Sequence, residues 1–227
     1  MFFLKHKVKN ISLGENQKVV LVVGGSGVLG KALFWEKPGN YFFINASRRS
    51  EIVGEDVFNY HMDLLGDIEK SIKLLSKHVS KVDILVNAAC YEGFTSIAEL
   101  NKENFLRELE IDVFAPVNIS MLCAKYFWAT DGMTKNIRLH RKVINISSGA
   151  AFGKTSRPEV ATYGAAKAAL DIMTTYLHDY LFGNFGVSAH LIAPGAFSDK
   201  DILGRTVKEI WNLSDRKQDS FSLAKIF

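Results

Sequence analysis

Short apolar runs alternate with longer stretches of helical periodicity in this chain, and this alternation limits its fold more than any other feature. The apolar runs, rich in β-branched residues, cover residues 19–23, 41–44, 82–86, 143–146 and 187–192. Apolar residues recur at helical spacing over residues 67–78, 104–128 and 163–182. Strands that alternate with helices form βαβ units and a parallel sheet. The sequence therefore predicts an α/β fold with helices on both faces of a doubly wound parallel sheet.

Length and composition fit one such domain. The chain has 227 residues, of which 48% are hydrophobic and 23% charged, as in ordinary globular proteins and unlike disordered chains. No repeat, linker or low-complexity segment interrupts it. We expect a single domain over residues 18–227, preceded by an arm or short hairpin over residues 1–17.

Charge and cysteine content exclude several classes of partner. The net charge of +4 lacks the strong basic stripe of a nucleic-acid-binding face. Cys90 and Cys123 are too few for a disulfide framework and have no metal-ligand spacing, so we expect no metal and place both in or near the core, where Cys90 can also border a site. No apolar run approaches the ~18 residues of a membrane span. We expect a cytoplasmic protein without membrane or nucleic-acid partners.

A glycine-rich turn follows the first apolar run directly. Residues 24–30 read Gly-Gly-Ser-Gly-Val-Leu-Gly, and a helical stretch begins at once after them. Glycines let the backbone approach a ligand closely, and the start of a helix offers N–H groups and a positive dipole end. The arrangement favours a site for the pyrophosphate of a dinucleotide. The alternative is a tight strand-to-helix turn that binds nothing.

The loop after the second apolar run contains Arg48 and Arg49 and no acidic residue before them. In dinucleotide-binding folds this loop meets the adenosine ribose, where an acidic side chain binds the two hydroxyls and an arginine accommodates a 2′-phosphate. The two arginines therefore favour NADP(H) over NAD(H). The alternative is a pair of solvated loop arginines.

Tyr163 and Lys167 are four residues apart in a predicted helix, so they lie on one face about a turn apart. A nearby ammonium favours the phenolate and lowers the pKa of a tyrosine. Tyr163 can then exchange a proton with a substrate oxygen near neutral pH. Ser148 follows the apolar run at 143–146 and offers a hydroxyl that can hold the same oxygen.

These motifs together resemble the short-chain dehydrogenase/reductase family, whose members have a Rossmann-like fold. The resemblance covers the chain from about residue 18 to residue 199. Six motifs stand in family order: the glycine turn at 24–30, Asp63-Leu64, Asn87-Ala88-Ala89, Ser148, the segment from Tyr163 to Lys167, and Pro194-Gly195.

The resemblance implies a set of site residues. Ser148, Tyr163 and Lys167 would be catalytic, and Asp112 stands at the position of the family's catalytic asparagine. In the family's reaction a nicotinamide passes a hydride to or from a carbon, while the tyrosine handles the proton on its oxygen. The residues implied to bind the cofactor are Gly24, Ser26, Gly27, Val28, Leu29, Arg48, Asp63, Leu64, Asn87, Ala88, Tyr163, Lys167 and Pro194.

Three features depart from the family pattern. The glycine spacing of the turn is more like that of the branch of the superfamily that modifies sugar nucleotides, although the chain is too short for that branch's usual substrate domain. Asp112 replaces an asparagine, and its charge should oppose phenolate formation at Tyr163. Residues 198–227 form a shortened substrate-covering region with one predicted helix at 202–213. The sheet therefore has six strands, or seven if residues 220–227 supply a poor last strand.

The sequence favours an NADP(H)-dependent oxidoreductase that interconverts a carbonyl and an alcohol of a small molecule. Two alternatives stay open: a cofactor-binding or assembly subunit that has lost activity, and a sugar-modifying epimerase or dehydratase. The predicted helices at 111–128 and 163–182 are apolar nearly all round, more than one sheet-facing stripe requires. The resemblance implies that they pair across a two-fold axis, and the absence of a clear seventh strand favours a homodimer over a tetramer.

Overall fold

The computed structural model describes residues 11, 13–14, 16–48, 51–91, 93–153, 157–217 and 220–227. Most of the predicted N-terminal arm, and Arg49, lie outside the described residues. Within the described residues, no helix is both long enough and apolar enough to cross a membrane.

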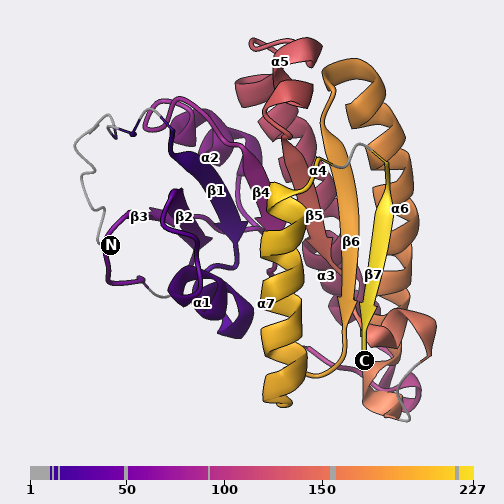
Figure 1. The fold of residues 1–227 in the computed structure, drawn as a ribbon. Helices are drawn as coiled ribbons and strands as arrows, with labels where there is room; N and C mark the ends of the chain where they lie inside the picture. Colours follow the sequence, from indigo (N-terminus) through magenta and orange to yellow (C-terminus); the bar gives the residue numbers. More distant parts are fainter. Residues whose placement is uncertain are drawn as a thin grey trace, which may run out of the picture.

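Seven parallel strands form one sheet, which confirms the predicted fold class (Figure 1). In sequence order they are β1 (Lys18–Val23), β2 (Tyr41–Ser47), β3 (Val57–His61), β4 (Ile84–Asn87), β5 (Lys142–Ile146), β6 (Ser188–Pro194) and β7 (Ser222–Ile226). In space the order is β3-β2-β1-β4-β5-β6-β7. The direction of winding thus reverses between β1 and β4, which is where open α/β sheets bind ligands.

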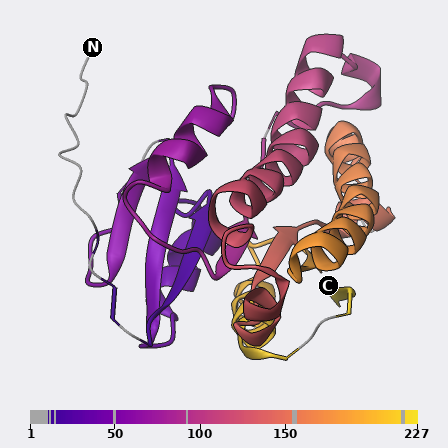
Figure 2. The ribbon, with the colours of Figure 1, turned by 90° about the horizontal axis from the view of Figure 1, so that it is seen from above.

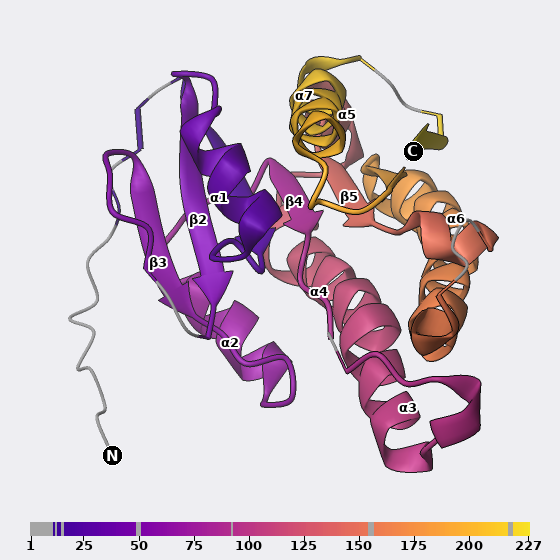
Figure 3. The ribbon, with the colours of Figure 1, turned by 90° about the horizontal axis from the view of Figure 1, so that it is seen from below.

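Helices cover both faces of the sheet, as Figure 3 shows from below. One face carries α1 (Val28–Trp35) and α7 (Lys200–Asp215), and the other carries α2 (Ile68–Leu75), α4 (Ala115–Cys123) and α6 (Ala161–Phe185). The shorter helices are α3 (Lys102–Leu109) and α5 (Met133–Arg138). Side chains alternate along each strand, so two buried clusters form, one on each face.

The long predicted helix at 104–128 is four consecutive segments. After α3 comes a π-helical turn, η2 (Glu110–Phe114), then α4, and then a second π-helical turn, η3 (Ala124–Trp128). Pro116 near the start of α4 has no N–H to donate, so it cannot continue a regular ladder of hydrogen bonds. The path from α3 to η3 then packs beside α6, as Figure 2 shows from above.

The seventh strand, doubtful in the sequence, is present and pairs in parallel with β6. Only Ile226 of its five residues is buried, so its apolar pattern is weak. Contacts supplied by other segments hold it in place: the Gly195 N–H donates to the Ile226 carbonyl at 2.7 Å, and the His190 ring lies 2.9 Å from the Ser222 hydroxyl. These contacts bring residues far apart in sequence together, which a local pattern cannot predict.

The helix of residues 202–213 is longer than expected and spans α7, Lys200–Asp215. Asp199 caps its start, because the side chain accepts a hydrogen bond from the Asp201 N–H at 2.8 Å. The face of α7 that includes Val207 and Ile210 is buried on the sheet. The region after Gly195 is therefore a sheet-packed helix followed by an edge strand.

Gly30 is predicted to be required for folding. A Cβ added to this residue of α1 would collide with the backbone of Gly25, so Gly30→Ala should lower the free energy of unfolding by ~1–3 kcal/mol. Gly204 in α7 is the matched control, because a Cβ there meets nothing within 4 Å. Gly204→Ala should instead stabilise the chain by about 0.5–1 kcal/mol. Urea unfolding measures both changes, and equal effects would contradict the close approach of Gly30 to the turn.

Candidate active site

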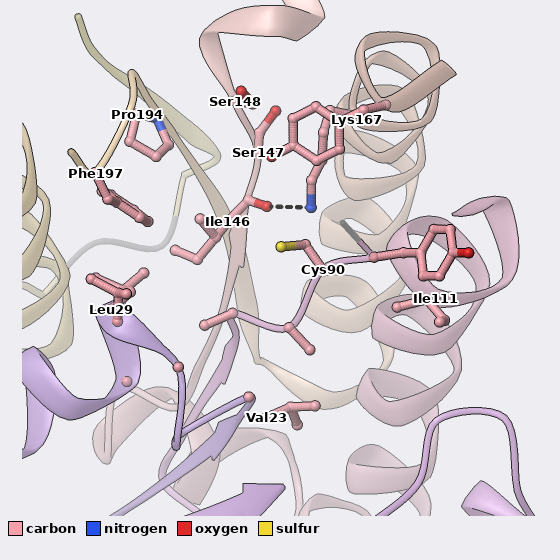
Figure 4. Close-up of a pocket in the computed structure, with 18 of the residues that line it drawn as sticks. Val23, Leu29, Cys90, Ile111, Ile146, Ser147, Ser148, Lys167, Pro194 and Phe197 are labelled. Carbon is pink, nitrogen blue, oxygen red and sulfur yellow. Dashed lines mark hydrogen bonds between the residues drawn. The ribbon is translucent and has the colours of Figure 1, made fainter. Parts of the chain in front are cut away.

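A cavity of about 840 Å³ opens at the carboxyl ends of the central strands. The strand ends are in register there: Val23 of β1 lies beside Asn87 of β4, and Asn87 lies beside Asn145 of β5. Loops that follow these strands therefore meet above the edge of the sheet, where Figure 4 shows their side chains around the cavity. The predicted residues that line it are Gly24, Ser26, Gly27, Val28, Leu29, Arg48, Leu64, Ala88, Ser148, Tyr163, Lys167 and Pro194.

The glycine turn forms the floor on the β1 side. Gly24 has a φ of +85°, and a Cβ on it would lie 2.6 Å from the Ala89 backbone nitrogen. Only glycine avoids both the strain and the collision. Gly27, the residue before α1, has no side chain to cap the helix, so the first N–H groups of α1 face the cavity side without a side-chain acceptor. This end of the cavity can accept an anionic group.

Asn87 supports the strand end and does not line the cavity. Its side-chain amide donates to Asn145 Oδ1 at 2.8 Å, and the Asn145 amide donates to the Thr174 hydroxyl of α6 at 2.9 Å. This buried chain of side chains joins β4, β5 and α6. Asn87 thus acts under the cavity, where it holds the backbone that carries Ala88.

Arg48 and Asp63 face each other at the β2 end of the cavity. Arg48 Nη1 lies 3.7 Å from Asp63 Oδ1, and both side chains are about half exposed. Asp63 itself is not among the lining residues, whereas its neighbour Leu64 is. An exposed ion pair of this kind contributes little stability, so the arginine can turn to another anion at low cost.

Tyr163, Ser148 and Lys167 converge at the opposite end of the cavity. A hydrogen bond joins the Ser148 hydroxyl to the Tyr163 phenol, and Lys167 Nζ lies 5.6 Å from the centre of the Tyr163 ring. Lys167 Nζ also donates to the Ile146 carbonyl of β5 at 3.0 Å, the dashed line in Figure 4. The strand end and one turn of α6 thereby place a hydroxyl, a phenol and an ammonium around one point.

The pKa of Tyr163 differs from the expectation drawn from its sequence neighbours. Burial raises this pKa above its ordinary value, Lys167 and the hydrogen bond to Ser148 lower it, and Cys90 and Asp112 raise it again. The net direction is upward. The expectation of a lowered Tyr163 pKa is therefore wrong, although Lys167 itself does act to lower it. Burial of a phenol disfavours its charged form, and the four-residue spacing contains no information on burial.

Asp112 contacts Lys167 directly. Asp112 Oδ1 lies 2.9 Å from Lys167 Nζ, and both side chains are buried, with 0% and 3% of their surface exposed. The other carboxylate oxygen accepts a hydrogen bond from the Tyr91 N–H at 3.0 Å. Burial lowers the pKa of Lys167, but the charge and hydrogen bond of Asp112, together with Tyr163 and Cys90, outweigh it and the net pKa is raised. Lys167 is therefore held as an ammonium ion.

The loop after β4 supplies side chains that the sequence analysis did not assign. The Phe94 ring packs edge-on against Tyr163 with ring centres 5.5 Å apart, and Tyr91 also lines the cavity. Cys90 is exposed and lines the cavity, with its sulfur on the side of Lys167 (Figure 4). Its expected place in the core is therefore wrong, whereas the expectation that it borders the site is confirmed; Cys123 is buried as expected. Figure 4 shows Phe197 beside Leu29 and Pro194, and Arg157, Val160 and Phe197 also line the cavity. None carries a local motif, so only the fold could identify them.

Among the described residues, no group of three or more His, Cys, Asp or Glu side chains can hold a metal ion. The side chains that meet at the site are a phenol, a serine hydroxyl, an ammonium and a buried carboxylate. These groups can bind an oxygen atom of a substrate and move a proton to or from it.

The chain is similar to known proteins over most of its length. A model of the family described as short chain dehydrogenase matches residues 18–209. An uncharacterized oxidoreductase of Thermotoga maritima is 28% identical over 201 residues, which are 83% of this chain and 75% of that protein.

Two solved structures share the fold. A short-chain dehydrogenase/reductase of Serratia marcescens has a TM-score of 0.76 at 19% identity and covers 94% of this chain and 97% of its own. A Brucella ovis oxidoreductase of the same family, in complex with a partially ordered NAD, has a TM-score of 0.72 at 23% identity and covers 93% of this chain and 100% of its own.

The buried ion pair is predicted to be non-additive in stability. Lys167→Met leaves the Asp112 carboxylate buried without its partner and should cost about 3–5 kcal/mol of unfolding free energy. The double variant with Asp112→Asn should recover part of that loss, because no unpaired charge then remains. Urea unfolding of the two single variants and the double variant measures the coupling. Losses that simply add would show that the two groups do not stabilise each other.

Proposed function

Since the chain belongs to the short-chain dehydrogenase family and is an NAD(P)-dependent oxidoreductase, we propose that it uses NADP(H) to interconvert a carbonyl and an alcohol of a small molecule. We further propose that Tyr163 is the proton donor and acceptor. The observation that carries the proposal is the convergence of Ser148, Tyr163 and Lys167 at one end of a cavity whose other end is a glycine cradle.

The residues present fit a dinucleotide. Gly24 leaves room that a Cβ would fill, and the first N–H groups of α1 offer a positive end for the pyrophosphate. The cavity continues from this cradle past Ala88 to Tyr163 and Lys167, so a molecule with phosphates at one end and a reactive ring at the other can span it. When bound, the cofactor would supply the hydride in reduction and accept it in oxidation.

The protein residues handle the oxygen and its proton. Ser148 donates a hydrogen bond to the substrate oxygen and positions it beside the Tyr163 hydroxyl. Tyr163 then gives its proton to that oxygen in reduction, or takes it in oxidation. The Lys167 ammonium, held by Asp112 and the Ile146 carbonyl, stabilises the negative charge that appears on Tyr163. Because burial raises the pKa of Tyr163, the phenol stays protonated as the proton donor in the direction of reduction.

We predict that removal of the Tyr163 hydroxyl abolishes turnover. Tyr163→Phe should lower kcat by ~10²–10⁴-fold with little change in NADPH affinity, because it removes the proton donor and leaves the ring. The measurement is NADPH oxidation with a panel of ketones, aldehydes and sugar nucleotides, beside cofactor titration. Tyr126→Phe is the control, because the Tyr126 hydroxyl contacts Glu69 and this residue does not line the cavity.

Retained turnover in Tyr163→Phe would show that another group is the proton donor. No turnover by the unmodified chain with any of these substrates, despite NADPH binding, would favour a subunit that has lost activity, for which the direct Asp112–Lys167 pair is the supporting observation.

Cofactor preference rests on Arg48. Its guanidinium stands at the end of β2, lines the cavity and is about half exposed, so it can reach a 2′-phosphate with a two-pronged hydrogen bond. Asp63, its present partner, would then release it at little cost. The Brucella ovis structure, which shares this fold, contains a partially ordered NAD, so the fold by itself does not select NADP(H).

We predict that the chain binds NADPH more tightly than NADH. Arg48→Ala should weaken NADPH binding by roughly 10- to 100-fold, because it removes hydrogen bonds to a charged group, and should change NADH binding little. Fluorescence titration with both cofactors measures the affinities. Arg157→Ala, at the other end of the cavity, is the control. Equal wild-type affinities for the two cofactors would contradict the role of Arg48.

We propose a homodimer through the outer faces of α6 and of the η2–α4 path. Large apolar side chains are exposed there, at Phe114, Ile172, Met173, Tyr176 and Tyr180. Such a surface on both neighbouring helices suits a second copy of the chain. The argument from a missing seventh strand does not hold, because β7 is present, so the edge of the sheet is open to a second contact.

Light scattering tests the assembly. The wild-type chain should be at least dimeric at micromolar concentration, and Tyr176→Glu should give a monomer, because a buried unpaired charge opposes association. Trp35→Glu is the control, an equally exposed aromatic residue at the end of α1 on the other face. A wild-type monomer would refute the interface, and a tetramer would indicate use of the β7 edge as well.

A further inference from the structure

Helix α3 buries a glutamate and exposes a leucine. Glu108 has 1% of its surface exposed and is the one fully buried residue of α3, whereas Leu106 is 53% exposed. Glutamate is almost never buried to this extent unless it is paired or protonated. The proposed reaction does not use this residue, so its burial needs another explanation.

The surroundings of Glu108 are the groups behind Lys167. Asp112 lies one turn further along the same helical path, in η2, and Thr162 and Lys167 face Glu108 from α6. Glu108 Oε1 and Thr162 Oγ1 are both buried, and neither makes a well-formed hydrogen bond among the described residues, although the Thr162 hydroxyl acts on Glu108 as a nearby donor. One buried carboxyl group, Asp112, therefore contacts the buried ammonium, and a second, Glu108, lies within range of the charges of both.

The charges at this place do not balance if both carboxyl groups are ionised. One ammonium and two carboxylates leave a net negative charge out of contact with water, which is costly. Asp112 accepts contacts from Lys167 and from the Tyr91 N–H, so its ionised form is stabilised. Among the described residues, Glu108 has only the Thr162 hydroxyl as a nearby side-chain donor. Burial is the largest effect and raises the pKa of Glu108. The Thr162 hydroxyl lowers this pKa, the charge of Asp112 raises it and Lys167 lowers it, and the net direction is upward.

We propose that Glu108 is a positioning residue for Lys167, and that it forms with Asp112 a buried carboxyl pair that holds a single proton. The proton resides on Glu108, and Asp112 stays ionised against Lys167. The inference rests on the proposed roles of Tyr163 and Lys167, but the pair itself is a property of the folded chain.

The single proton matters for Tyr163. With Glu108 neutral, the Asp112 carboxylate balances the charge of the Lys167 ammonium. The net charge of these groups near the Tyr163 hydroxyl is then close to zero. When Glu108 ionises at higher pH, a second negative charge is added and opposes phenolate formation at Tyr163. The other charged or titratable groups that act on Lys167 are Cys90 at the cavity and Asp171 one turn further along α6.

Carbon-13 NMR of protein labelled at glutamate carboxyl groups tests the pair directly. One glutamate should titrate well above the ordinary value of ~4.3, and its signal should be absent in Glu108→Gln. In Asp112→Asn its midpoint should fall by about one pH unit or more, because a like charge is removed. Glu110→Gln, an exposed glutamate two residues further on, is the control and should leave the midpoint unchanged.

A second readout concerns Tyr163. Its titration is followed by the ultraviolet difference absorbance of tyrosinate and assigned by its loss in Tyr163→Phe. Glu108→Gln should lower the Tyr163 midpoint by about half a pH unit or more at an effective dielectric of ~20, whereas Glu110→Gln should not. A purely structural glutamate would change stability and leave this titration in place.

Three results would overturn the inference. Glu108 could titrate at the same pH as the exposed glutamates, its midpoint could stay unchanged in Asp112→Asn, or the Tyr163 midpoint could stay unchanged in Glu108→Gln. If Glu108→Gln does not fold, the wild-type and Asp112→Asn titrations still decide whether the pair shares a proton. None of these titrations requires turnover, so failure of the proposed reaction, seen in the kinetics of Tyr163→Phe, is distinguishable from failure of the carboxyl pair.

Discussion

All seven strands run in one direction, and the rest of the molecule depends on this constraint. Parallel pairing requires each connection to cross from one end of the sheet to the other, so every loop that follows a strand emerges at the same edge. Val23, Asn87 and Asn145 lie side by side in the register at that edge. The glycine cradle, the loop with Phe94 and the serine before α6 are therefore neighbours although more than a hundred residues separate the first from the last. The parallel direction of the strands therefore determines where the cavity lies, and the side chains determine its shape and chemistry.

The buried pair of Asp112 and Lys167 connects this geometry to chemistry. A lysine with 3% exposure would lose its charge without a partner, and a neutral amine could not stabilise a phenolate. Asp112 keeps the ammonium charged, and through the Tyr91 N–H it also ties down the loop that carries Phe94 against Tyr163. Its place in a π-helical turn, where the helix widens by one residue, lets the carboxylate turn inward. The same charge raises the pKa of Tyr163. Asp112 therefore keeps Lys167 charged, which favours the phenolate, and at the same time directly disfavours the phenolate through its own charge.

Elements with a strong local pattern were predictable, and elements held by distant contacts were not. The runs that became β1, β2, β5 and β6 are apolar because both faces of a central strand are buried. β7 buries only Ile226 and depends on Gly195 and His190, so its existence could not be read from its own residues. The pKa of Tyr163 is raised, contrary to the expectation from its sequence neighbours, for a related reason: the spacing to Lys167 is local, whereas burial depends on every neighbour in space.

The α/β class, the glycine turn and the pairing of Tyr163 with Lys167 follow from the order of the residues, because strand and helix periodicity and a four-residue spacing are properties of consecutive residues. The direct contact of Asp112 with Lys167, the packing of Phe94 on Tyr163, and the burial of Glu108 beside an exposed Leu106 arise from the packing of distant segments. The physical reason is that electrostatic energy and burial depend on distance in space. Residues 108 and 112 lie on the continuous path from α3 to η2, and residue 167 lies on α6. Their charges interact only because the fold packs this path beside α6.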